Sequence, residues 1–265
     1  MRDLPTRARA WLELLRVPNL LTTPGDPLAG AAIALLAGAD DAAGVAWWTV
    51  RIAAACVTAL LLYAVGLVQN DLADLDVDAL ERPDRPLPSG RLAARSAYRL
   101  LAALALAALA IAAAAYLPML WVTAVLAIVI SLYNRGTKTL RVLGPLNMGL
   151  CRGGSLVLGA AAIGWDGLRQ WPVWLAAGGL TLYVATVTMI ARGETQRRRL
   201  DFLKWAPVTV AFAWAAGMGA WRAVAIGGEG LFGYVVLASW AVIWVAIWSE
   251  HLRKSPSPRV VQGVV

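Results

Sequence analysis

Carboxylates gather in one short stretch of an otherwise apolar chain. Six of the sixteen Asp and Glu residues lie between Asp71 and Asp84, although 60% of the 265 residues are hydrophobic. At about 100° per residue, Asp71, Asp74 and Asp78 share one face of a helix, and Asp76 points away from them. Carboxylate oxygens suit Mg²⁺, which completes its coordination with phosphate oxygens and water. The spacing therefore predicts a site for Mg²⁺ and a diphosphate.

A solvated acidic loop between two helices is the alternative interpretation of these residues. The sequence that follows favours the binding site, because arginines that can hold phosphate oxygens come next. Prolines end the helix there and keep the segment extended. The arginines are Arg82, Arg85, Arg91 and Arg95, and the prolines are Pro83, Pro86 and Pro88.

Long apolar runs indicate a membrane protein that crosses the bilayer several times. Only 15% of the residues are charged, and runs long enough to span a bilayer recur along the chain. We predict one all-α domain over residues 1–265, a transmembrane helical bundle with eight spans. These spans lie near residues 14–37, 47–69, 95–116, 118–133, 143–164, 173–190, 203–222 and 231–250. No cleavable signal peptide is expected, because the charged residues 1–16 run directly into the first span.

Basic residues are distributed unequally between the two sides of this bundle. With the N-terminus in the cytoplasm, twenty of the 24 Lys and Arg residues fall on the cytoplasmic side. We therefore expect the aspartate-rich loop to face the cytoplasm, and we assign the protein to a bacterial inner membrane. The net charge of +8 follows from this bias and requires no nucleic-acid partner.

Few soft or nitrogen ligands are available for other metals. The two cysteines, Cys56 and Cys151, both fall in predicted spans, and His251 is the single histidine. Zinc, haem and iron–sulfur centres therefore lack the ligands that they need. Mg²⁺ is the one metal that the sequence predicts.

Charges inside predicted spans are costly and mark functional candidates, and two of them stand out. Asp26 lies between Pro24 and Pro27, where we expect the helix to kink or break. Arg152 lies roughly 13 Å into the fifth span, at 1.5 Å per residue. The two either form a buried ion pair with each other or line a polar substrate cavity, and both alternatives stay open.

Two further polar segments lie on the predicted cytoplasmic side. Tyr133 to Lys138 follow the fourth span and lead to Asn147, and a basic run that contains Glu194 follows the sixth. Basic loops alone are expected from the charge bias. Acidic and basic segments at one membrane face, however, suit a diphosphate whose lipid tail lies between helices.

These residues resemble the UbiA superfamily of intramembrane prenyltransferases, from about residue 16 to residue 260. Asn70 with Asp71, Asp74 and Asp78 matches its NDxxDxxxD motif, and residues 82–90 match the adjoining RPxRPLPSG stretch. Positions that resemble other patterns of the family are Arg16, Asn19, Gly30, Tyr133, Lys138, Gly144 and Asn147.

The resemblance implies an all-helical bundle around a cavity that opens sideways to lipid. It also implies Mg²⁺-dependent transfer of an isoprenyl group from a polyprenyl diphosphate to a small acceptor, expected to be aromatic. With the intramembrane charges and the basic segments, it gives catalytic candidates Asp71, Asp74, Tyr133 and Lys138. The candidate metal ligands are Asp71, Asp74, Asp78 and Glu194. The candidate substrate-binding residues are Asn19, Asp26, Asn70, Arg82, Arg85, Asn147, Arg152, Arg192 and Arg197.

Two departures from the family pattern keep alternatives open. The second aspartate-rich motif, usual after the sixth span, is reduced here to Glu194 and the more distant Asp201 among basic residues. A single Mg²⁺, with arginine in place of the second ion's charge, is therefore an alternative to two ions for binding the diphosphate. The Arg-Gly-Glu run at residues 192–194 resembles the divergent EboC-type branch of the family. Family members commonly have nine spans, and residues 258–265 resemble the start of a ninth. Eight spans with both termini inside and a truncated ninth span are the two alternatives. The competing functions are a non-catalytic carrier of an isoprenoid or amphipathic metabolite and an intramembrane terpene cyclase.

Overall fold

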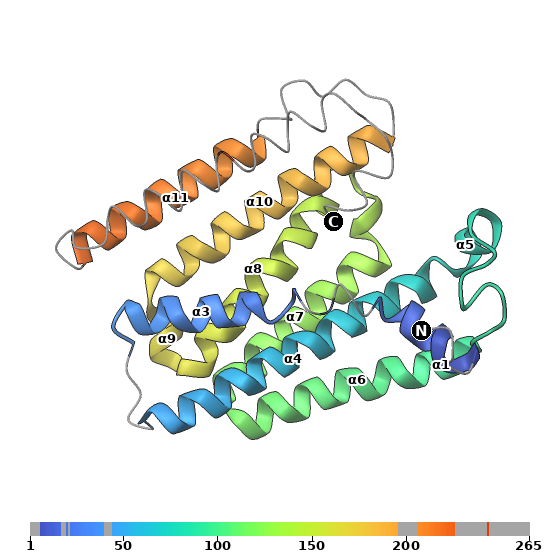
Figure 1. Cartoon of the computed structure of the whole chain (residues 1–265), viewed down its shortest axis with the longest axis horizontal. Coiled ribbons are helices and arrows are strands. Elements are labelled where there is room, and N and C mark those ends of the chain that lie inside the picture. Colours follow the sequence, from blue (N-terminus) through green and yellow to red (C-terminus); the bar gives the residue numbers. More distant parts are fainter. Residues whose placement is uncertain are drawn as a thin grey trace. The chain divides into compact units, whose positions relative to one another are not determined.

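The computed structural model describes residues 6–16, 20, 22–39, 44–195, 206–225 and 243, and these contain helices and turns without a strand (Figure 1). Apolar side chains on all faces and the scarcity of charge make these segments helical within a membrane. The helices are α1 (Thr6–Leu14), α3 (Gly25–Leu36), α4 (Gly44–Ala73), α5 (Leu75–Glu81), α6 (Ala94–Ala115), α7 (Leu117–Arg135), η1 (Thr137–Thr139), α8 (Leu143–Ile163), α9 (Trp165–Arg169), α10 (Trp171–Thr195) and α11 (Ala206–Ala225).

Five of these helices are long and apolar enough to cross a membrane: α4, α6, α7, α8 and α10. They confirm the second to sixth predicted spans to within a few residues. Helix α11 overlaps the seventh, and its stretch Pro207–Gly219 is apolar. The eighth predicted span and the possible ninth lie outside the described residues. The chain is an all-helical integral membrane protein, as the apolar runs predicted.

The first predicted span is divided in the structure. Helix α1 ends at Leu14, and α3 begins at Gly25, directly after a turn that ends at Pro24. Pro27 lies in the first turn of α3, where a missing N–H breaks no hydrogen bond. The twelve residues of α3 rise about 18 Å, which is short of a hydrocarbon core of about 30 Å. The prolines thus produce the break expected around Asp26.

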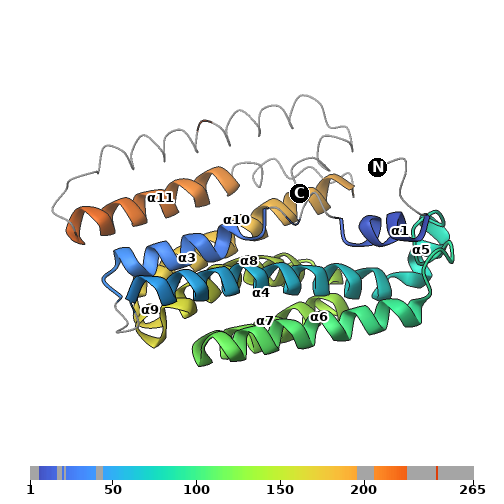
Figure 2. The same ribbon diagram turned by 60° about the horizontal axis from the view of Figure 1, so that its bottom comes forward.

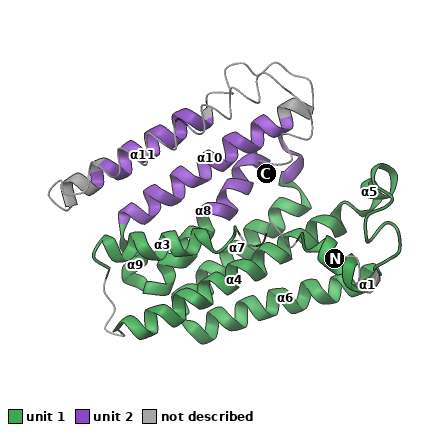
Figure 3. Cartoon of the chain, in the orientation of Figure 1, with its two compact units in different colours: residues 1–137, 154–170 green, residues 138–153, 171–265 purple. Residues whose placement is uncertain are grey.

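Contacts group the chain into two units (Figure 3). Unit 1 comprises residues 1–137 and 154–170, and unit 2 comprises residues 138–153 and 171–265. In unit 1, α4 packs against α6 and α7 and also contacts α3 (Figure 2). The fully buried alanines of α6, among them Ala97, Ala108 and Ala112, leave room for close helix packing. The prediction of one domain over the whole chain stays a prediction.

Glycines bring several helices into backbone contact. In unit 1, a Cβ at Gly159 of α8 would collide with the carbonyl oxygen of Pro27 in α3. In unit 2, Gly149 and Gly153 of α8 face the backbone of α10 in the same way. Small residues are what membrane helices use to approach this closely, since lipid offers no hydrophobic force to drive them together.

An apolar cluster packs together the segments at the end of unit 1 that carries the aspartates. Its side chains come from α1, the end of α4, the segment between α5 and α6, and the start of α6. Burial of these side chains holds α1 and the 82–92 segment against α4. The buried members are Ala10, Leu14, Val68, Leu72, Leu87, Leu92 and Ala97.

Candidate active site at the aspartate-rich end of unit 1

The aspartate motif spans the junction of α4 and α5. Asp74 lies between the two helices with φ −96° and ψ 8°, yet helical hydrogen bonds continue across it. The Asp74 amide donates to the Asn70 carbonyl at 2.9 Å, and the Asp78 amide donates to the Asp74 carbonyl at 2.8 Å. Asp71 and Asp78 are therefore both turned inward, 6% and 5% exposed. Asp76 is exposed, as the helical spacing predicted.

The Arg85 guanidinium lies between the two buried aspartates. Its Nη1 is 2.5 Å from Oδ2 of Asp78 and 3.8 Å from Oδ1 of Asp71. Arg16, which follows α1, donates from Nη2 to the same Oδ1 of Asp71 at 3.0 Å. Two buried carboxylates would otherwise repel each other, so these guanidinium groups provide the compensation that burial requires.

The predicted face of three carboxylates is only partly assembled. Within the described ranges, no three Asp, Glu, His or Cys side chains surround one point where a metal ion could sit. Asp74 stands half-buried at the helix junction, where the backbone leaves helical dihedral angles. Asp71 and Asp78 still fit one Mg²⁺, which typically takes one or two carboxylates, because a cation already lies between them. Their role as metal ligands stays a prediction.

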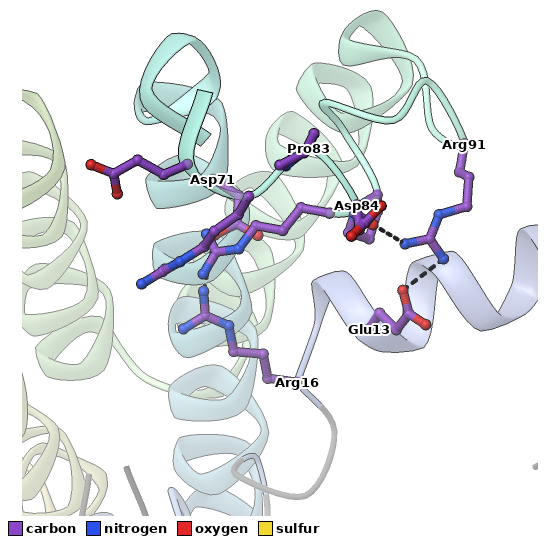
Figure 4. A pocket seen from close by; sticks show the side chains of 10 residues that line it. Glu13, Arg16, Asp71, Pro83, Asp84 and Arg91 are labelled. Atoms are coloured by element: carbon purple, nitrogen blue, oxygen red, sulfur yellow. Dashed lines mark hydrogen bonds and ion pairs between the residues drawn. The ribbon is translucent and has the colours of Figure 1, made fainter. Parts of the chain in front are cut away.

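A cavity of about 460 Å³ opens beside Asp71 (Figure 4). In Figure 4 the Arg16 side chain extends toward Asp71 from the chain after α1. Four arginines and four acids line the cavity, so their formal charges cancel. The lining residues are Glu13, Arg16, Asp71, Glu81, Arg82, Pro83, Asp84, Arg85, Pro86 and Arg91. The predicted phosphate-binding residues Arg82 and Arg85 are thus brought together with Asp71.

Arg91 ties the 82–91 segment together and joins it to α1. Its Nη1 lies 2.8 Å from Oε2 of Glu13, and its Nη2 donates to the Asp84 carbonyl at 2.6 Å. Its Nε donates to the Ser89 hydroxyl at 3.2 Å. Sequence analysis missed Glu13, for which the only signal was an acid in the otherwise basic and apolar α1.

A buried amide network next to the motif was also missed. Asn134 of α7 donates from Nδ2 to Oε1 of Gln69 in α4 at 3.3 Å and to a backbone carbonyl of α4 at 3.2 Å. Gln69 donates in turn to the Ser131 hydroxyl at 3.4 Å. The network flanks Asn70 and Tyr133, so it fixes the register of the two helices that carry these candidates. Amides inside apolar spans were the available signal.

Other predicted residues are spread over the two units. Tyr133 lies half-buried near the end of α7, and Asp26 is buried at the start of α3, both in unit 1. Lys138 lies half-buried in η1, and Asn147 and Arg152 lie on α8, all in unit 2. The ion pair between Asp26 and Arg152, and the role of Lys138 beside the aspartates, stay predictions.

The basic segment after the sixth span is described only in part. Arg192 of α10 donates from Nη1 to the Leu140 carbonyl at 3.3 Å, so it holds the segment that follows η1 within unit 2. Glu194 lies in α10, but its side chain is outside the described part of the chain, as are Asn19 and Arg197. A second metal ligand at Glu194 stays a prediction.

Known proteins share this sequence pattern over much of the chain. The UbiA prenyltransferase family matches residues 28–259. A digeranylgeranylglyceryl phosphate synthase of Ignicoccus hospitalis is 35% identical over 183 residues, which cover 66% of this chain and 56% of that protein. The chain thus spans little more than half the length of this relative.

Solved structures share the fold. A UbiA homologue from Aeropyrum pernix K1 has a TM-score of 0.67 and 20% identity, and the match covers 92% of each chain. A UbiA homologue from Archaeoglobus fulgidus bound to DMAPP and Mg²⁺ has a TM-score of 0.62 and 17% identity, covering 92% of this chain and 87% of that one. At these identities the likeness shows the fold alone. The family match, however, runs through most of the sequence and includes the aspartate motif and the arginine–proline stretch, and this chain belongs to the UbiA prenyltransferase family.

Proposed function

We propose that the protein transfers an isoprenyl group from a polyprenyl diphosphate to a small acceptor within the membrane, with Mg²⁺ as cofactor. The observation that carries this proposal is the pair of buried aspartates around one cation, beside a cavity lined by arginines. Family membership supports it. The A. fulgidus homologue bound to DMAPP and Mg²⁺ provides a precedent for the ligands.

The balanced charge of the cavity explains why a metal ion is needed. A bare diphosphate carries several negative charges, and the four acids of the lining offset the four arginines. When bound by Asp71 and Asp78, with Asp74 as a further candidate, Mg²⁺ would supply the missing positive charge and stabilise the leaving diphosphate. A diphosphate therefore fits this site as its Mg²⁺ complex.

The chain's own residues supply orientation and charge stabilisation. Arg82 is exposed at the cavity and Arg85 is half-buried, so both can donate to phosphate oxygens. As the allylic C–O bond breaks, its electron pair leaves with the diphosphate, and the arginines stabilise the charge that develops. The acceptor then bonds to the allylic carbon and loses a proton. An apolar interior protects the allylic cation from water.

The remaining candidates have proposed supporting roles. We assign Asn70, Tyr133 and Lys138 to diphosphate binding and Glu194 to a second metal position. Asn19, Asp26, Asn147, Arg152, Arg192 and Arg197 are assigned to the rest of the substrate site. These roles rest on the sequence comparison and on the cost of leaving charge in a membrane.

Two acceptor classes are proposed. An aromatic ring was expected from the resemblance, because an electron-rich ring captures an allylic cation. The I. hospitalis relative is named for making digeranylgeranylglyceryl phosphate, which favours an alcohol on a glyceryl phosphate lipid as the second class. We also propose that the aspartate end faces the cytoplasm, on the strength of the charge bias; the bacterial inner membrane stays a prediction.

The test measures diphosphate release and prenylated product by protein in lipid nanodiscs. Geranylgeranyl diphosphate is supplied with Mg²⁺ or EDTA, and with a phenolic acceptor, a glyceryl phosphate lipid or neither. We expect Mg²⁺-dependent release that requires one acceptor. Asp71→Asn and Asp78→Asn are expected to lose about 100-fold in activity. Asp76→Asn, an exposed change in the same motif, is the matched control and keeps activity.

Three outcomes would contradict the proposal. Release with neither acceptor would indicate a cyclase or a hydrolase. Binding without release would indicate a carrier of isoprenoids. Activity that EDTA leaves intact would refute the metal site.

A further inference from the structure

The segment that carries Arg82 and Arg85 depends on side chains for its position. Residues 82–93 form turns between α5 and α6. The backbone amides of Arg85, Ser89, Gly90 and Leu92 donate to carbonyls of residues 82–87, within the segment itself. Three prolines supply no amide donor. The Arg82 amide attaches the start of the segment to the Asp78 carbonyl of α5 at 2.8 Å, and the other bonds stay within the segment. Side chains therefore position the rest of it, through the apolar contacts of Leu87 and Leu92 and the polar contacts of Arg85 and Arg91.

Arg91 contacts residues near both ends of the segment and also contacts α1. It donates to the Asp84 carbonyl at 2.6 Å and to the Ser89 hydroxyl at 3.2 Å, while its Nη1 pairs with Glu13 at 2.8 Å. The Ser89 hydroxyl donates on to the Arg85 carbonyl at 2.6 Å. A continuous chain of hydrogen bonds thus leads from the Glu13 carboxylate to the backbone of Arg85.

The chain directly after α1 makes a second contact with the site. Arg16 pairs with Asp71 at 3.0 Å, and Arg85 pairs with Asp71 and Asp78. Contacts therefore close a ring that runs from Glu13 through the 82–91 segment to the aspartates and back to Arg16. Figure 4 shows Glu13 and Arg91 on the opposite side of the pocket from the Arg16 contact. The ring restrains where the Arg85 guanidinium can lie.

We infer that Glu13 is a positioning residue, which acts through Arg91 to hold the 82–91 segment where Arg82 and Arg85 meet the diphosphate. The inference rests on the proposed function and adds a residue to it. Glu13 also lines the cavity and pairs with Arg9, whose Nε lies 3.4 Å from its Oε1, so the test has to separate the route through Arg91 from a direct effect of its charge. Loss of Glu13 is therefore expected to weaken diphosphate binding more than it slows the chemical step.

The test compares kinetic constants and metal–pyrophosphate binding among variants of the full chain. Glu13 and Arg91 side chains are 38% and 35% exposed, so a moderate effect is expected. Glu13→Gln should raise the KM for prenyl diphosphate about fivefold, with kcat changed less than about twofold and the KM for acceptor unchanged. Arg91→Gln loses the carbonyl and hydroxyl bonds as well, and should raise the KM about twentyfold.

The double variant separates positioning from independent effects. If Glu13 acts through Arg91, Glu13→Gln adds nothing to Arg91→Gln, and the double variant shows the KM of Arg91→Gln alone. Arg7→Gln removes a charge from an exposed side chain of α1 and is the control that keeps the wild-type KM. Calorimetric titration with inorganic pyrophosphate and Mg²⁺ gives a second readout without turnover, in which Glu13→Gln weakens binding about fivefold.

Each outcome decides between the claims. Additive effects in the double variant, or a Glu13→Gln protein with wild-type pyrophosphate affinity, would overturn the positioning role and leave the proposed function standing. A Glu13→Gln variant that loses kcat and melting temperature at an unchanged KM would show a merely structural role and overturn it as well. Wild-type protein that binds no pyrophosphate would overturn the proposed function and this inference together.

Discussion

Replacing Arg85 by glutamine tests whether the buried aspartates require a cation between them. In the wild-type protein, Nη1 of Arg85 lies 2.5 Å from Asp78 and 3.8 Å from Asp71. Glutamine keeps a hydrogen-bond donor but removes the charge. Asp78 then loses the guanidinium group of Arg85, and Asp71 keeps Arg16 at 3.0 Å. The variant should be less stable, and unusually responsive to divalent cations.

The stability that Arg85→Gln loses can be worked out from how deeply the three side chains are buried. The Asp78 and Asp71 side chains are 7% and 8% exposed, whereas Arg85 is 26% exposed. Removing one partner of a fully buried ion pair costs about 3–5 kcal/mol. Partial exposure of Arg85 and the remaining Arg16 contact reduce this to about 2 kcal/mol. With about 2–4 °C per kcal/mol for a chain of this size, the melting temperature should fall by about 4–8 °C.

Thermal melts in nanodiscs, with and without millimolar Mg²⁺, measure this effect. Mg²⁺ should raise the melting temperature of Arg85→Gln more than that of the wild type, because the ion binds the folded state where the guanidinium was. Arg82→Gln, an exposed change in the same segment, is the stability control and should melt within about 1 °C of the wild type. An Arg85→Gln protein that melts like the wild type and ignores Mg²⁺ would refute this account of the site.

Two further changes test the packing that positions the site. Gly159→Ala should cost about 1–3 kcal/mol, because its methyl group would meet the Pro27 carbonyl. Gly178→Ala, where no described atom lies within 4 Å, is its control and should not destabilise. Asn134→Leu should cost about 1–3 kcal/mol, since it removes the amide that donates to Oε1 of Gln69. Melting temperatures check both, and unchanged values would contradict the contacts described.

Helix periodicity and apolar length explain which features were predictable. Spans such as α4 and α6 follow from apolar runs, because the bilayer requires about twenty such residues wherever a helix crosses it. Asp71 and Asp78 face the same way because the i to i−4 hydrogen bonds persist through the junction. The break before α3 followed from Pro24 and Pro27. Apolar length, helical spacing and proline positions are local properties, so they can be read from neighbouring residues in the sequence.

Contacts between distant segments were not predictable from one sequence. The Glu13–Arg91 pair and the Gln69–Asn134 bond each join residues more than sixty positions apart, and nothing in their local spacing predicts the partner. The three-carboxylate face stays a prediction. Its spacing argument assumes a continuous helix, whereas Asp74 departs from helical dihedral angles.

Helix α1 contributes the apolar side chains of Ala10 and Leu14 and the charged side chain of Glu13 to the same end of unit 1, and the turn after it adds Arg16. Protein engineering therefore has to treat residues 6–16 as belonging with residues 71–92. A chimera that exchanges one of these segments without the other would combine mismatched surfaces, and a bulky fusion that strains α1 would disturb Asp71 although its own attachment point is far away along the sequence. Exchanging the two segments as a matched set avoids both problems.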